Sequence, residues 1–194
     1  MSEPSPTDLL MLFQRAQAQF TDRVDAVGPG EWDAPALPEW SVADLVAHLT
    51  NEQLWVPPLL AGEEPAEVAR RIPTDTEELL GGDPLTAWET AADAALTAWA
   101  APGALEQTVR LSGGRPAVEH LVEMTADLTV HAWDLARAVD GVTALDGELV
   151  AAALSHAEAH LGEDGLPGVI APPVAVSPDA DPQTRLLARY GRRA

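Results

Sequence analysis

Apolar residues recur at intervals of three and four along most of the chain, the spacing that gives an α-helix one apolar face. Such stretches cover about residues 9–27, 42–55, 85–99, 116–139 and 147–161. Helices with a single apolar face must bury those faces against one another, so the pattern predicts an all-α helical bundle. No shift in composition divides the 194 residues, and we therefore expect one domain over 1–194.

Local signals indicate where these helices begin and end. Ser41, with Asp44 three residues later, predicts a capping box at the start of the second helix. That helix is expected to end before Pro57, because proline lacks the N–H that a helix interior needs. Between the helices we expect loops over 31–40 and 61–82 (the latter with a short helical turn), a short strand over 108–111, an extended Pro-rich connection over 166–182 and a short terminal helix over 184–190.

The charge and composition of the chain exclude several classes of function. There are 31 acidic and 11 basic residues, a formal charge of -20, which argues against a nucleic-acid partner and against anionic membrane surfaces. All the basic residues are Arg, so a lysine Schiff base is excluded. Because there is no Cys, disulfides, Cys-ligated zinc and a protein thiol nucleophile are excluded as well. Any thiol used by this protein must arrive on a small molecule.

Nothing in the sequence resembles a targeting or membrane segment. The N-terminal residues 1–8 are polar and acidic, unlike a signal peptide. No stretch reaches the roughly 18 consecutive apolar residues that a transmembrane helix needs. We therefore expect a cytoplasmic location.

Two side chains of the fourth expected helix could bind a metal ion together. Asp127 and His131 are four residues apart and share one helix face, and a carboxylate oxygen with an imidazole nitrogen suits a divalent metal. Such a pair is also common as an ordinary helix-face contact. His48, next to the apolar stripe of the second helix, is by itself more typical of a hydrogen-bonded core histidine. A bundle brings facing helices together, however, and His48 would complete a set of two histidines and one carboxylate.

Three segments carry a family resemblance. Residues 40–49, WSVADLVAHL, resemble the W-[ST]-v-x-D-L-v-x-H-l signature of the DinB-like superfamily and, more narrowly, of the mycothiol-dependent maleylpyruvate isomerase N-terminal-domain group. The lead-in over 37–40 is similar to the family's c-P-x-W, with Leu at the Cys position. Residues 130–138, VHAWDLARA, resemble its v-H-x-W-D-L-A-r-A motif, and residues 176–192 resemble the end of stand-alone members.

The resemblance implies a DinB-like four-helix bundle with additional short helices and a divalent metal bound by His48, Asp127 and His131. Asp127 stands where the family usually has Glu, so the metal would lie closer to the fourth helix or bind less tightly. Three protein ligands leave an open coordination position, which is typical of catalytic metal sites. Zinc is the first expectation, with nickel and iron(II) as alternatives, because the same ligand set suits non-haem iron.

The expected function follows from this site and the resemblance. The metal would activate a low-molecular-weight thiol of the mycothiol type for transfer to, or isomerisation of, a small electrophilic substrate. The chain ends before the additional C-terminal domain of the full isomerases, so thiol transfer or detoxification is favoured over maleylpyruvate as substrate. The alternatives are a non-catalytic metal- or small-ligand-binding protein and a metal-free dimerising scaffold. The pattern also leaves a homodimer open.

Two further residues of the second motif are candidate helpers. Asp134 lies three residues after His131 and can accept a hydrogen bond from its imidazole N–H, although a purely structural Asp fits equally well. Arg137 could bind an anionic group of the thiol or substrate, but an ion pair with a nearby carboxylate is favoured. For Trp40 and Trp133, core packing is favoured over lining a pocket.

The remaining histidines and the C-terminal arginines are expected to have structural roles. His156 and His160 have a metal-compatible spacing, but a solvated helix face is favoured, and His120 is more typical of a helix surface than of a pocket. The C-terminal arginines favour a solvated terminal helix, with docking onto the acidic body as the alternative: Arg185, Arg189, Arg192 and Arg193.

Overall fold

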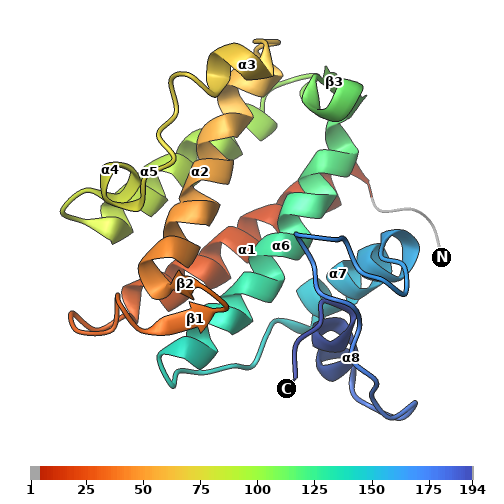
Figure 1. The fold of residues 1–194 in the computed structure, drawn as a ribbon. Helices are drawn as coiled ribbons and strands as arrows, with labels where there is room; N and C mark the ends of the chain where they lie inside the picture. Colours follow the sequence, from red (N-terminus) through yellow and green to blue (C-terminus); the bar gives the residue numbers. More distant parts are fainter. Residues whose placement is uncertain (1–4, 194) are drawn as a thin grey trace.

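The computed structural model describes residues 5–193, and its centre is a bundle of four long helices (Figure 1). These helices are α1 (Pro6–Asp25), α2 (Val42–Leu60), α5 (Pro84–Trp99) and α6 (Ala117–Ala138). The closest packing pairs α2 with α5 and α1 with α6. The predicted all-α four-helix bundle is therefore confirmed. Among residues 5–193, no helix combines the length and the apolar character needed to cross a membrane.

Shorter elements surround the bundle. Helices α3 (Pro65–Val68) and α4 (Thr76–Leu80) lie between α2 and α5, where the sequence predicted a loop with a helical turn. Helix α7 (Gly147–His160) packs on α6, and α8 (Pro182–Arg189) packs on α7 (Figure 1). The connection predicted as extended over 166–182 has no helix or strand over 171–181, as expected, but it begins with a tight turn closed by an antiparallel bridge between Leu166 and Ile170.

Two clusters of buried side chains meet at α6. The larger one fills the bundle and includes Phe20 and Trp88, whose rings pack edge to face at 4.7 Å. The smaller one, here called the C-terminal core, lies between α6, α7 and α8 and includes Val130, Leu154 and Tyr190. Helix α6 is therefore buried on two sides, which explains its long run of buried residues from Leu128 to Ala136.

The capping box that fixes the start of α2 is present as predicted. The Oδ2 atom of Asp44 accepts a hydrogen bond from the backbone N–H of Ser41 at 3.0 Å, and the Oγ atom of Ser41 accepts one from the backbone N–H of Asp44 at 3.1 Å. The other carboxylate oxygen of Asp44 accepts from the Thr76 hydroxyl at 2.7 Å and so ties α4 to this helix end. These contacts fix the register of α2 and the direction of the side chains one turn further on.

Two parts of the backbone differ from the sequence-based expectation. The prediction that α2 ends before Pro57 is wrong, because the helix continues through Pro57 and Pro58 to Leu60. A proline φ angle is compatible with a helix, and the cost of the missing N–H groups is limited to the last turn, where Pro58 and Leu59 are buried. The expected loop over 31–40 contains a small antiparallel hairpin of β1 (Pro35–Leu37) and β2 (Trp40–Ser41).

A second small hairpin precedes α6. Strand β3 (Thr108–Val109) pairs antiparallel with β4 (Arg115–Pro116), on either side of the 3-10 turn η1 (Leu111–Gly113). The strand predicted over 108–111 is thus confirmed at Thr108–Val109, whereas Leu111 already belongs to the turn. The hairpin leads the chain directly into α6, the helix that carries Asp127 and His131.

Candidate metal centre

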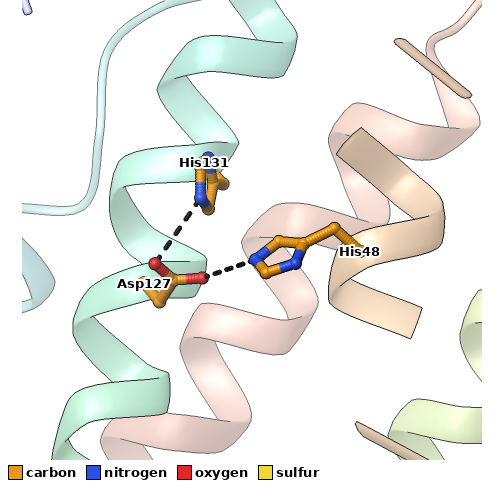
Figure 2. A group of neighbouring side chains, drawn as sticks. All are labelled: His48, Asp127 and His131. Atoms are coloured by element: carbon orange, nitrogen blue, oxygen red, sulfur yellow. Dashed lines mark ion pairs between the residues drawn. The ribbon is translucent and has the colours of Figure 1, made fainter. Parts of the chain in front are cut away.

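Helices α2 and α6 bring three candidate ligands together (Figure 2). His48 comes from α2, and Asp127 and His131 come from one face of α6. The Nε2 atom of His131 lies 3.5 Å from Asp127 Oδ1, and the Nε2 atom of His48 lies 3.6 Å from Asp127 Oδ2. One ligand atom from each of the three residues lies within 4.8 Å of the others.

Asp134 holds His131 through the ring nitrogen that faces away from Asp127. Its Nδ1 atom lies 2.9 Å from Oδ2 of Asp134, a fully buried carboxylate. Burial would raise the pKa of Asp134, but its hydrogen bonds to His131 and Arg192 outweigh this and hold the pKa below its ordinary value. An ionised carboxylate only accepts hydrogen bonds, so the His131 hydrogen lies on Nδ1. The Nε2 atom is directed toward Asp127 and is the ring nitrogen available to a metal ion.

His48 lies on the more open side of the group. Its side chain is 32% exposed, against 9% for His131. The Trp40 ring lies 5.0 Å from the His48 ring, and the His131 ring packs edge-on against it at 5.6 Å. The Oε1 atom of Glu52, one helical turn further along α2, lies 3.6 Å from His48 Nε2. Trp40 and Glu52 therefore border the side from which a small molecule can approach.

The electrostatics of the carboxylates are unusual for a helix surface. Burial, reinforced by the charge of Asp127, raises the pKa of Glu52 to about 8. Burial also acts to raise the pKa of Asp127, but the nearby imidazoles of His131 and His48 outweigh it, and the net shift is downward. Two carboxylates this close together repel unless positive charge lies between them.

The donor set fits a divalent metal ion. The Oδ2 atom of Asp127 is buried and has no hydrogen-bond partner among the described residues. The separations of 3.5 and 3.6 Å between the carboxylate and the imidazoles are too long for good hydrogen bonds. They match two ligands that each lie about 2.0–2.2 Å from a shared ion.

Of the two candidate helper residues in the second motif, Asp134 contacts the site and Arg137 does not. The carboxylate of Asp134 lies in hydrogen-bond contact with Nδ1 of His131, as predicted for a residue that supports a metal-binding histidine. The predicted ion pair of Arg137 is wrong for the described residues: its Nη2 atom donates to the backbone carbonyl of Ala36 at 2.9 Å, and the guanidinium lies over the Trp133 ring. This carbonyl belongs to β1, so Arg137 ties the first hairpin to α6.

The two tryptophans also differ. Trp133 is buried, as predicted. The prediction of core packing is wrong for Trp40, which is 36% exposed. Trp40 lies in the short strand β2, immediately before the capping box, and this position directs its ring onto His48 instead of into the bundle.

The other histidines lie outside the three-residue group. The rings of His156 and His160 stack at 4.4 Å on the outer side of α7, with His160 exposed and His156 half-buried. In the described part of the chain they join no set of metal-compatible ligands. His160 is exposed, as predicted for a solvated helix face, whereas His156 is not fully solvated. His120 is half-buried, with its ring against Trp99 and its Nδ1 atom 3.7 Å from Glu123.

Two of the C-terminal arginines, Arg189 and Arg192, are docked, so the favoured prediction of a solvated helix is wrong for them, whereas Arg185 is exposed as predicted. Arg185 pairs with Glu158 at 2.6 Å, and Arg189 donates to backbone carbonyls at the end of α7. Arg192 pairs with the buried Asp134 at 2.8 Å. The large excess of acidic groups on the body of the protein explains this docking.

Sequence reasoning missed Glu52, and it named Arg192 only as a C-terminal arginine that could dock onto the acidic body. Glu52 had a detectable signal, because it lies four residues after His48 on the same helix and therefore shares its face. The contact of Arg192 with Asp134 had no signal in the sequence, because it joins positions 58 residues apart. Only the packing of α8 against α7 brings this arginine to α6.

The comparisons with known proteins agree with this architecture. Residues 13–136 match the family model of the mycothiol maleylpyruvate isomerase N-terminal domain. Two proteins of Mycobacterium tuberculosis, the uncharacterized proteins MT0763 (strain CDC 1551 / Oshkosh) and Rv0738 (strain ATCC 25618 / H37Rv), are each 34% identical to the chain over 158 residues. The alignment covers 80% of this chain and 80% of each relative.

Two solved structures have a similar fold. The crystal structure of the mycothiol-dependent maleylpyruvate isomerase has a TM-score of 0.62 and 18% sequence identity, and a variant of that enzyme with a histidine replaced by alanine has a TM-score of 0.60 at the same identity. Each comparison covers 81% of this chain and 70% of the other. The expected DinB-like fold is thus confirmed, and the match over residues 13–136 shows that the chain belongs to the mycothiol maleylpyruvate isomerase N-terminal domain family.

Proposed function

We propose that this protein is a metal-dependent enzyme that activates a low-molecular-weight thiol of the mycothiol type for reaction with a small electrophile. His48, Asp127 and His131 would hold the metal, with zinc as the first candidate. The observation that carries the proposal is the carboxylate of Asp127: its buried Oδ2 atom has no hydrogen-bond partner among the described residues and lies 3.6 Å from Nε2 of His48, while its Oδ1 atom lies 3.5 Å from Nε2 of His131. A divalent cation would satisfy all three side chains at once.

The chemistry of the site suits a thiol. A zinc ion with two imidazoles and one carboxylate, when bound, supplies Lewis-acid activation that lowers the pKa of a thiol. The chain has no Cys, so the thiol comes from a small molecule. A bound cation beside Asp127 would lower the pKa of Glu52, whose carboxylate, at 3.6 Å from His48 Nε2, would then be placed to accept the proton that the thiol loses. Trp40 offers an exposed apolar surface beside His48 for the less polar part of a substrate.

The substrate class is drawn from the family. The solved structures with this fold are of a mycothiol-dependent maleylpyruvate isomerase, which supports a thiol cosubstrate and a small electrophile. Thiol transfer or detoxification is our proposal for this chain, with isomerisation as the related reaction. A single domain over 1–194, a cytoplasmic location and small-molecule partners belong to the same proposal.

Elemental analysis of purified protein tests the metal centre directly. Wild type, His48→Ala, His131→Ala and the matched control His156→Ala are compared for metal per chain. We expect about one divalent ion per chain in wild type and the control, and little in the other two variants. No ion in wild type, even after addition of zinc, nickel or iron(II), would refute the proposal and favour a metal-free scaffold.

Activity is tested next, on the metal-loaded wild type. Loss of a small-molecule thiol in the presence of electrophiles is followed by a colorimetric thiol assay and mass spectrometry. Turnover that disappears in His48→Ala supports the enzyme. Stoichiometric metal with no turnover over a broad panel of thiols and electrophiles would instead indicate a metal- or ligand-binding protein.

A further inference from the structure

The C-terminal segment reaches the back of the candidate metal centre. The Nη2 atom of Arg192 donates to Oδ2 of Asp134 at 2.8 Å, and its Nε atom donates to Oδ1 at 3.3 Å. The same Oδ2 atom lies 2.9 Å from Nδ1 of His131. Arg192 lies beyond residues 13–136, the part of the chain that matches the family model. A residue outside the matched region thus contacts the group that holds His131.

The turn after α8 fixes the position of Arg192. Gly191 has a φ angle of +77°, and the backbone N–H of Arg192 donates to the carbonyl of Leu187 at 2.8 Å, as in a helix C-terminal cap. A Cβ atom on Gly191 would lie 2.7 Å from the Cβ atom of Ala171, so the close approach of the two segments requires glycine here.

The guanidinium itself is held on two sides. Besides Asp134, it donates from Nη1 to the carbonyl of Tyr190 at 2.7 Å, and its side chain is only 16% exposed. These contacts distinguish it from an exposed surface arginine, which keeps many rotamers. Since the side chain is already ordered, little further conformational entropy is lost in holding Asp134.

The ion pair of Arg192 with Asp134 determines which ring nitrogen of His131 carries the hydrogen. A buried carboxylate is strongly unfavourable unless it is paired and hydrogen-bonded. Because an arginine stays protonated, Arg192 supplies a permanent positive charge to Asp134 and leaves its Oδ2 atom as an acceptor for the N–H of His131. The imidazole then keeps its hydrogen on Nδ1 and presents Nε2 toward Asp127.

We propose that Arg192 is a positioning residue of the candidate metal centre: through Asp134 it fixes the ring orientation and the tautomer of His131, and so sets the metal affinity. This inference rests on the proposed metal centre. It makes the segment from α8 to Arg192 part of the site, although that segment contributes no ligand.

The test compares Arg192→Met with Arg185→Met, which removes an ion pair of the same segment that lies away from the site. Zinc dissociation constants are measured by competition with a chelator, and the ring ¹⁵N shifts of His131 are measured by NMR in the metal-free proteins, at a pH high enough for the ring to be neutral. We expect Arg192→Met to weaken zinc binding about 10- to 100-fold and to give a mixture of His131 tautomers. Arg185→Met should change neither. Arg192→Lys should recover part of the affinity, because an ammonium restores the charge but not the two-point contact.

Two results would overturn the proposal. One is a zinc affinity of Arg192→Met within twofold of wild type. The other is a His131 that stays in the Nδ1–H form without Arg192. If Arg192→Met does not fold, as judged by circular dichroism, Arg192→Lys provides a smaller version of the comparison, because it keeps the charge but removes the two-point contact, and an unchanged zinc affinity in that variant would then overturn the proposal. If wild type binds no zinc, the proposed function fails, and the tautomer of His131 in the metal-free variants still decides the role of Arg192.

Discussion

The two histidines of the candidate metal centre are held in opposite ways. His131 is buried, and a carboxylate and then a guanidinium stand behind its Nδ1 atom. His48 is 32% exposed, and in the described part of the chain its ring makes no hydrogen bond; it contacts Trp40 and lies 3.6 Å from two carboxylates. One ligand is therefore preorganised and the other adjustable.

This difference has a functional reason. A fixed ligand confers affinity, because the protein has already lost the conformational entropy of ordering it. An adjustable ligand lets the coordination shell change when a thiol or another small molecule arrives, as catalytic sites with an open position require. The adjustable histidine is also the one next to Glu52, on the side open to solvent.

The largest expected effect comes from removing each histidine in turn. His48→Ala and His131→Ala should each weaken zinc binding more than about 100-fold. In the metal-free proteins, however, His131→Ala should lower the free energy of unfolding by about 1–3 kcal/mol, because it leaves buried Asp134 with an unfilled hydrogen bond. His48→Ala should change it by less than about 0.5 kcal/mol. Chemical denaturation checks this, and equal losses in both variants would remove the distinction.

Low pH should remove the stability that Asp134 confers through its contacts with His131 and Arg192. The pKa of Asp134 is lower in the folded state than its ordinary value of 3.8, so the folded state binds fewer protons. The stability that this carboxylate confers is complete above that ordinary value and is lost as the pH falls through the folded-state pKa. Asp134→Asn should therefore lower the melting temperature clearly at pH 7 and by less as the pH falls below 3.8. A constant difference across this range would contradict the assignment.

On the open side, Glu52 should have the opposite pH dependence. Its pKa rises from 4.5 to about 8 on folding, so the folded state binds more protons and loses stability as the pH rises between these values. In metal-free protein at pH 8, Glu52→Gln should be more stable than wild type by about 1 kcal/mol after allowance for solvent screening, or about 2–4 °C. The difference should vanish near pH 4. The exposed carboxylate of Glu119 provides the control, and Glu119→Gln should show no such trend.

The smallest expected effect concerns Trp40. Because its ring is 36% exposed and touches the adjustable histidine, Trp40→Ala should reduce zinc affinity only two- to threefold, equal to about 0.5 kcal/mol. Isothermal titration calorimetry would measure this. A loss of tenfold or more would show that His48 depends on its aromatic neighbour and is less adjustable than its exposure indicates.

Features encoded by short-range spacing could be predicted from the sequence. The apolar stripes gave the bundle helices, and Ser41 with Asp44 gave the start of α2. His131 lies four residues after Asp127 and three residues before Asp134 on one helix, so their shared face follows from helix geometry alone. The pairing of His48 with them needed the resemblance, because periodicity does not show which faces of two helices meet.

Features that depend on tertiary packing could not be predicted from the sequence. Proline ends most helices, but burial of the last turn of α2 outweighs the two N–H groups that Pro57 and Pro58 lack. Trp40 has the composition of a core residue, yet the hairpin before α2 leaves it partly exposed. Arg192 reaches Asp134 only because two helices and a long connection bring it back to α6.

The burial of α6 between two cores has a consequence for how the molecule exchanges its amide hydrogens. Helices α7 and α8 contact the bundle mainly through α6, so they form a unit that can open without unfolding the rest. Opening of this unit would withdraw Arg192 from Asp134, and a ligand that favours the closed form would oppose it. At a free zinc concentration 100 times the dissociation constant, full coupling would add about 2.7 kcal/mol of protection. The amides of α8 would then report on the occupancy of a site to which they contribute no ligand.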